Sequence, residues 1–179
     1  NLDKQHTIPV IKKSATYFID ESYNKDFAHQ CRKILHDSSV NDSFEIREIP
    51  DKNVANIEIY LVPRKEMMLM RGDKPLETYP GTNKPIYFSW TYRYPKPVIY
   101  IDEENWLYGV TESGLSLDNY RTYVIQHEFM HALGFDHQVC DSRTAPNGVC
   151  PIMYQSTRGC PAGFKCGYNI TKYDYEKRI

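Results

Sequence analysis

The spacing of apolar residues along the chain predicts a mixed α/β domain. Residues 15–20, rich in aromatic and β-branched side chains, indicate a first strand. Apolar residues then recur at spacings of four, seven and eight, which predicts an amphipathic helix over residues 24–37 with Asn24 as its N-cap. Cys31 lies on the apolar stripe of this helix, so we expect it to be a small buried hydrophobe.

Further apolar runs predict the rest of the secondary structure. Strands are expected at residues 44–49, 56–62, 86–92 and 98–102. Ser116 or one of its neighbours is expected to cap a long helix over about residues 117–134, and the chain then becomes loop-like until Thr171. There, T-K-Y-D resembles a capping box and predicts a short terminal helix. Strands flanked by helices in this order indicate a layered α/β (α+β) domain.

Length and charge narrow the class of protein. The chain has 179 residues, which favours one domain, and a formal net charge of −1. That charge gives no basic stripe for nucleic acid. No apolar run approaches the roughly 20 residues that a membrane span needs. We therefore expect no nucleic-acid partner and no membrane span. We also expect a monomer.

The segment HEFMHALGFDH, residues 127–137, holds the candidate chemistry. His127 and His131 are four residues apart and would share one face of the predicted helix, where two imidazoles can bind one metal ion. Gly134 would let the helix end and the chain turn sharply, bringing His137 back as a third ligand. This set predicts one catalytic Zn²⁺ with an open fourth position, and Glu128 beside it as general base.

The same segment matches H-E-x-x-H-x-x-G-x-x-H, and the chain therefore resembles the metzincin zinc endopeptidases. Met153, in C-P-I-M-Y, matches the methionine turn of that clan, and the C-terminal residues resemble the closing helix of matrixins. The resemblance implies a twisted mixed five-stranded sheet with an active-site helix. It also implies an upper subdomain at about residues 1–137 and an irregular lower one at about 138–179.

The resemblance also implies how a peptide would be held and cleaved. An extended substrate would pair with the strand from Ile86 to Tyr92. Tyr154 would assist at the oxyanion, although some metzincins place that tyrosine one residue later. At the position where matrixins often carry a structural-zinc histidine this chain has Tyr100, which leaves a second zinc and any calcium site open.

Four of the five cysteines fall within the last third of the chain. Two disulfides among Cys140, Cys150, Cys160 and Cys166 would staple a long loop, and this favours a secreted or extracytoplasmic protein. Local pairing, 140 with 150 and 160 with 166, is expected; pairing 140 with 160 and 150 with 166 stays open. The alternative is a structural Cys₄ zinc, although the spacings are wider than those of a zinc ribbon.

The expected function is a zinc-dependent endopeptidase. One alternative is a metzincin-like domain that binds a metal or a peptide without cleaving it, which an intact Glu128 argues against. Another is an adhesion protein that displays Arg71-Gly72-Asp73, a short motif in a stretch where glycine and aspartate are common anyway.

Overall fold

A five-stranded mixed sheet forms one layer of the structure, a computed structural model that describes residues 8–177. The strands are β1 (Lys13–Ile19), β2 (Phe44–Glu48), β3 (Ile57–Val62), β4 (Trp90–Tyr92) and β5 (Val98–Asp102). They lie in the order β2-β1-β3-β5-β4; the first four are parallel, and β4 runs antiparallel to β5 at the edge. The mixed five-stranded sheet predicted from the sequence is confirmed.

The described part of the chain contains four α-helices: α2 (Lys25–Asp37), α3 (Arg64–Arg71), α4 (Glu103–Tyr108) and α5 (Leu117–Ala132). The predicted N-caps of α2 and α5 are present, and the predicted capping box at Thr171 also forms. The side chain of Asn24 accepts from the backbone of Phe27 at 2.9 Å, and that of Ser116 accepts from Asn119 at 3.2 Å. Such caps satisfy backbone donors that a helix leaves free, at about 1 kcal/mol each. None of the described helices is long and apolar enough to cross a membrane.

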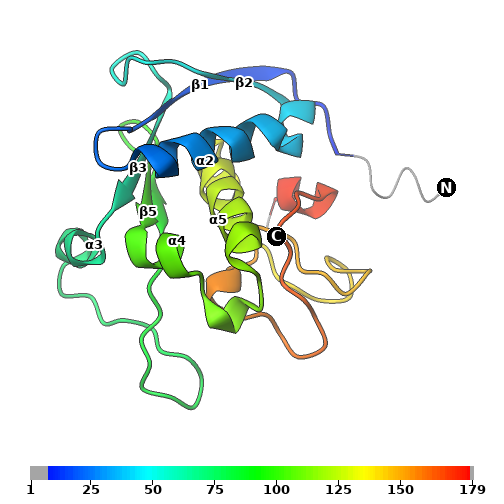
Figure 1. Cartoon of the computed structure of the whole chain (residues 1–179). Helices are drawn as coiled ribbons and strands as arrows, with labels where there is room; N and C mark the ends of the chain where they lie inside the picture. The colour runs from blue at the N-terminus through cyan, green and yellow to red at the C-terminus, as the bar shows by residue number, and fades with distance from the viewer. Residues whose placement is uncertain (1–7, 178–179) are drawn as a thin grey trace.

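The hydrophobic core lies between one face of the sheet and the helices α2 and α5, and α5 runs through the middle of the molecule (Figure 1). Alternate residues of β3, Ile57, Ile59 and Leu61, are buried, as expected when successive side chains of a strand point to opposite faces. Phe129 of α5 is buried in the same core. Cys31 is fully buried with a free thiol, which confirms its expected place.

After α5 the chain forms loops and two short 3-10 helices, Ser156–Arg158 and Lys172–Tyr175. Two disulfides close this region, Cys140–Cys150 and Cys160–Cys166. The local pairing is therefore confirmed, and both the crossed pairing and the Cys₄ zinc site are wrong. Only one turn of the expected terminal helix forms, and it is a 3-10 helix; residues 178–179 lie outside the described part.

The strand expected from Ile86 to Tyr92 is shorter than predicted. Only Trp90–Tyr92 pairs with β5, because the residues before it make other contacts. The backbone N–H of Ile86 donates to Glu77 at 2.7 Å, and the carbonyl of Tyr87 accepts from the Asn105 amide at 2.7 Å. The first half of the run thus belongs to a separate loop.

Two helices were not predicted. α3 begins after Pro63, which provides no side-chain cap, and only Met67 of its residues is buried. Such a short helix carries too weak an apolar pattern to be recognised. α4 does carry a signal in the sequence: the side chain of Asp102 caps it by accepting from the backbone N–H of Asn105, two glutamates follow, and Gly109 ends it.

The Arg71-Gly72-Asp73 motif lies at the end of α3. Arg71 is the last helical residue, and Gly72 follows with a positive φ of 76°. The guanidinium of Arg71 donates to the backbone oxygens of Pro75 at 2.6 Å and of Lys74 at 3.4 Å. The guanidinium of Arg71 is therefore held in part by its own loop.

Candidate metal centre

Helix α5 carries three of the four residues of the predicted site. His127 and Glu128 lie in its last two turns and are only 3% and 4% exposed, and His131 is half-buried one turn further on. The helix is buried on several sides, which fits a central helix rather than an amphipathic surface one. Polar groups are thus held at the centre of the domain, where each must find a partner.

A turn at Gly134 brings the fourth residue back to the helix. Gly134 has a φ of +104°, a conformation that a residue with a Cβ rarely adopts. The N–H of Gly134 donates to His131 and that of Phe135 to Met130, both at 3.0 Å, which closes the helix end. His137 follows in the segment beyond, which has no regular secondary structure.

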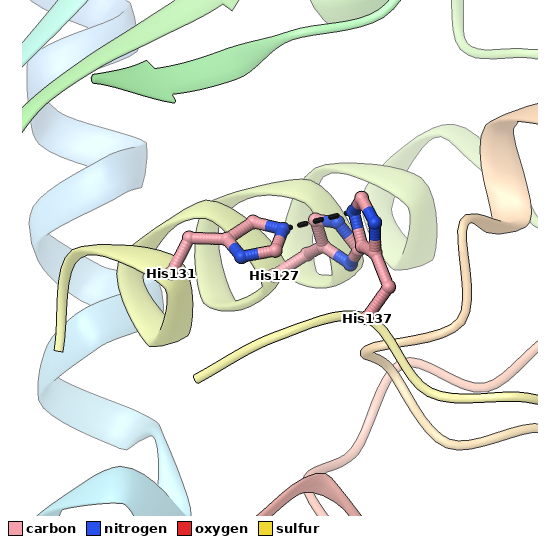
Figure 2. A group of neighbouring side chains, drawn as sticks. All are labelled: His127, His131 and His137. Atoms are coloured by element: carbon pink, nitrogen blue, oxygen red, sulfur yellow. Dashed lines mark hydrogen bonds between the residues drawn. The ribbon is translucent and has the colours of Figure 1, made fainter. Parts of the chain in front are cut away.

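The three histidines converge as the sequence predicts. One nitrogen from each of His127, His131 and His137 lies within 4.8 Å of the other two, and Nε2 of His131 lies 3.0 Å from Nε2 of His137. Figure 2 shows two rings projecting from the same side of α5 and the third reaching them from the segment after the turn. Among residues 8–177, this is the only group of three or more histidine, cysteine or carboxylate side chains close enough to hold a metal ion.

Backbone carbonyls orient two of the imidazole rings. Nδ1 of His127 lies 2.5 Å from the oxygen of Ile152, and Nδ1 of His131 lies 2.8 Å from the oxygen of Phe135. A carbonyl can only accept, so each Nδ1 carries the proton and each Nε2 bears a lone pair; that of His131 faces Nε2 of His137, to which it is hydrogen-bonded. This is the tautomer that a metal ligand needs.

Burial keeps these rings uncharged. It lowers the pKa of His127 well below its ordinary value, and the neighbouring His131 lowers it further. The pKa of His131 is also lowered, again mainly by burial. At neutral pH both rings are therefore neutral, the form that binds metal ions.

Glu128 lies beside the histidines, and a residue of the edge strand β4 forms a hydrogen bond with its carboxylate. Its Oε1 accepts from the hydroxyl of Thr91 at 2.9 Å, and its Oε2 lies 4.0 Å from Nε2 of His127. Burial raises the pKa of Glu128 to about 8. A carboxyl group with a pKa near neutrality, next to a group of nitrogen ligands, is suited to take up and release a proton.

The segment that contains Met153 lies against the histidines. Ile152 supplies the carbonyl that His127 contacts, and Met153 is fully buried in the core. The backbone N–H of Met153 donates to the carboxylate of Asp174 at 2.8 Å, and its oxygen accepts from Gln138 at 2.9 Å. The backbone of Met153 is thus held by Asp174, in the terminal 3-10 helix, and by Gln138, the residue after His137.

Tyr154 is directed towards its own loop. Its hydroxyl donates to the carbonyl of Gly159 at 3.4 Å, and its backbone oxygen accepts from the hydroxyl of Tyr123 at 3.2 Å. From this part of the chain, Gln155 and Thr157 line the neighbouring cavity. The oxyanion role of Tyr154 stays a prediction.

A cavity of about 890 Å³ opens over the histidines. The side chains of all three, and Glu128, line it on one side. Residues 88–94, which include β4, line another side, and α3 contributes residues at its C-terminal end. A volume of this size is that of a typical ligand site.

Three supporting residues were missed from the sequence. Thr91 holds Glu128, and Asp174 accepts from both Thr171 and Met153. Arg93 donates to the carbonyls of His131 at 3.0 Å and Phe135 at 2.6 Å. Only Asp174 had a signal, its place in the capping box; the partners of the other two lie 37 to 42 residues away.

Most of this site lies in a stretch of the chain that matches a known protein family. A family model described as "Protein of unknown function (DUF3152)" matches residues 40–167. The matched stretch contains β4, α5, all three histidines and the four disulfide-bonded cysteines. A search of curated proteins gave no match.

Proposed function

The chain belongs to the DUF3152 family, whose function is unknown, and we propose that it is a zinc-dependent endopeptidase. One observation carries the proposal: three histidine nitrogens converge beside a buried glutamate on the wall of a cavity. Three protein ligands with a fourth position open to the cavity are the pattern of catalytic rather than structural zinc sites.

The donor set fits Zn²⁺. Imidazole nitrogen is one of the ligands that zinc prefers, and the carbonyls of Ile152 and Phe135 hold the proton on Nδ1, so that Nε2 of His127 and of His131 presents a lone pair. The metal would be held by these two nitrogens and by Nε2 of His137. Nε2 of His131 and Nε2 of His137 are 3.0 Å apart, close enough for both to bind the same metal ion.

When bound, zinc makes water acidic enough to act as a nucleophile near neutral pH and polarises a carbonyl oxygen. Glu128 would take the proton from the attacking water and later give it to the leaving amine. Its burial suits both roles, because a carboxylate with a raised pKa is a stronger base and gives the proton back to an amine. The hydroxyl of Thr91 would hold Glu128 in place.

The edge strand would hold the substrate. Among the described residues β4 pairs on one side only, with β5, so none of them occupies its other edge, which could pair with an extended peptide. Thr91 of this strand contacts Glu128, so a peptide paired there would run close to the histidines. The strand that offers this edge, Trp90–Tyr92, is shorter than the run from Ile86 to Tyr92.

We further propose that the fold is metzincin-like and that Met153 is the methionine of its turn. The H-E-x-x-H-x-x-G-x-x-H spacing, the antiparallel edge strand and the buried Met153 next to Ile152 support this. The two disulfides favour an oxidising compartment outside the cytoplasm.

Removal and return of the metal tests the proposal. The full chain is treated with a chelator, dialysed and assayed on a library of internally quenched peptides, before and after one equivalent of Zn²⁺ is added. Cleavage should disappear with the metal and return with it. The His131→Ala variant should neither retain zinc nor recover. Cleavage that survives complete metal removal, or full zinc binding by His131→Ala, would contradict the assignment.

A further inference from the structure

We propose that the cavity selects peptides with acidic side chains, and that Arg71 and Lys74 provide this selectivity. The inference rests on the proposed function, since it assigns a substrate class to the same cavity. Both residues line the cavity from α3 and the segment that follows it. Neither belongs to the metal centre or to the edge strand.

The charges along the cavity wall do not cancel. Its lining contains three cations, Arg71, Lys74 and Arg93, and two carboxylates, Glu128 and Asp136. Arg93 is paired with Asp136 at 3.0 Å. For Arg71 and Lys74 the described residues offer no ion pair with a carboxylate.

Glu128 lies beside His127, where a bound divalent cation would outweigh its single negative charge. It is buried, and its hydrogen-bond partner is Thr91. A divalent cation at the histidines would make the cavity more positive still. The wall near α3 therefore carries two cations that pair with no carboxylate among the described residues, and Asp73, which lies between them in the sequence, does not line the cavity. An acidic side chain of the substrate would supply the counter-charge.

The wall that carries the two cations is anchored to the rest of the cavity. Further along the same segment, the hydroxyl of Tyr79 donates to the carbonyl of Thr157 at 2.8 Å, and Glu77 pairs with Arg158 at 3.0 Å. Thr157 itself lines the cavity. The segment after α3 is thus tied to the loop beyond Met153, which keeps its charges at the cavity.

The two cations differ in how firmly they are held. The guanidinium of Arg71 is fixed by the carbonyl of Pro75 at 2.6 Å, whereas Lys74 is exposed. Arg71 is therefore a positioned donor for a carboxylate, and Lys74 adds charge with little geometric demand. Charge reversal at Lys74 changes the field at the wall without removing a contact on which the fold depends.

Matched peptide substrates test the selectivity. One quenched scaffold is made with Asp or Glu, with Asn or Gln, and with Lys at each position flanking the cleaved bond. For the wild type, kcat/KM should be about threefold to tenfold higher for the acid than for its amide at one or more positions. The preference should shrink when salt is raised from ~0.05 M to ~0.5 M.

Lys74→Glu should lower the ratio of acid to amide by a similar factor and raise the rate on the Lys peptides. Lys65→Glu is the matched control, because Lys65 is exposed on the same helix and does not line the cavity. Its ratio should equal that of the wild type. A wild-type ratio near one, or a ratio that Lys74→Glu leaves unchanged, would overturn the inference while the endopeptidase assignment stands.

A binding measurement separates the two proposals. The zinc-loaded Glu128→Gln protein is titrated into a fluorescein-labelled acidic peptide and its amide counterpart, and anisotropy is read. Tighter binding of the acidic peptide, lost in the Lys74→Glu background, supports the selectivity even if no peptide is cleaved. Equal binding of both peptides refutes it. Absence of cleavage by the zinc-loaded wild type would contradict the endopeptidase assignment alone.

Discussion

Arg93 lies next to the metal ligands without being one, and its replacement by alanine should weaken zinc binding. Its guanidinium donates to the carbonyls of His131 and Phe135 and pairs with Asp136, so it holds the turn between the second and third histidines. The Phe135 carbonyl also orients His131. Arg93→Ala would leave the backbone of this turn freer to move, and the ligands would have to be ordered when the metal binds.

The size of the effect follows from these contacts. Hydrogen bonds from a charged donor contribute about 1.5–3 kcal/mol each, and we use the low end because the Arg93 side chain is 36% exposed. The pair with Asp136, itself 65% exposed, adds about 0–1 kcal/mol. The contacts of Arg93 therefore contribute about 3–4 kcal/mol in total. Zinc affinity changes only by the part of this energy that differs between the metal-free and the metal-bound protein. We expect Kd for zinc to rise about 10-fold to 100-fold, or about 1.4–2.8 kcal/mol.

Competition with a chromophoric zinc chelator measures this Kd directly. Arg93→Lys should be intermediate, because an ammonium keeps the charge but cannot bridge two carbonyls in the same way. Arg47→Ala is the control, since Arg47 is an exposed arginine of β2. A cooperative thermal unfolding transition in each metal-free variant would show that the variant is folded. If folded Arg93→Ala binds zinc as tightly as the wild type, the arginine does not position the ligands.

Three further predictions test the surroundings of the site. Thr91→Val should lower kcat about 10-fold to 100-fold with little change in KM or bound zinc, because a hydrogen bond to the Glu128 carboxylate is lost. Thr91→Ser keeps the hydroxyl and should keep kcat near that of the wild type, which steady-state kinetics would test. At pH 7, below the pKa of about 8 that burial gives Glu128, the metal-free carboxyl is protonated and a bound cation would displace that proton. Calorimetry in buffers of different ionisation enthalpy should therefore show about one more proton released per zinc by the wild type than by Glu128→Gln, and equal release would contradict it. Cys150→Ala should cost about 2–3 kcal/mol of unfolding free energy, as expected for the loss of a disulfide that closes a loop of this length, and a loss well under 1 kcal/mol in denaturant titration would be evidence against that role.

The candidate metal centre was predictable because its signal is local. A spacing of four on one helix places His127 and His131 together whatever the rest of the fold does. Gly134, with its positive φ, is the residue type that such a turn requires, and it allows His137 to return. The strong caps at Asn24 and Ser116 are local in the same way, and both formed as expected.

The residues that support the site could not be predicted from the sequence, because their roles depend on contacts between segments that are distant in the chain. Thr91 and Arg93 lie on or next to a three-residue strand, and their roles arise only when that strand packs beside α5. Arg71 is part of a familiar tripeptide, but its place on the cavity wall depends on the end of α3. Such short elements carry weak periodicity, so tertiary packing decides both where they form and what they contact.

The central claim, that a zinc ion at the three histidines is used with Glu128 to hydrolyse peptides, is tested most directly by one paired measurement. Bound zinc and the rate of peptide cleavage are determined on the same preparations of the wild type and Glu128→Gln. We predict one zinc per chain in both proteins and a loss of rate of about 10²-fold to 10⁴-fold in the variant, as expected for removal of a general base. Cleavage by the zinc-loaded variant at a rate near that of the wild type would contradict the account.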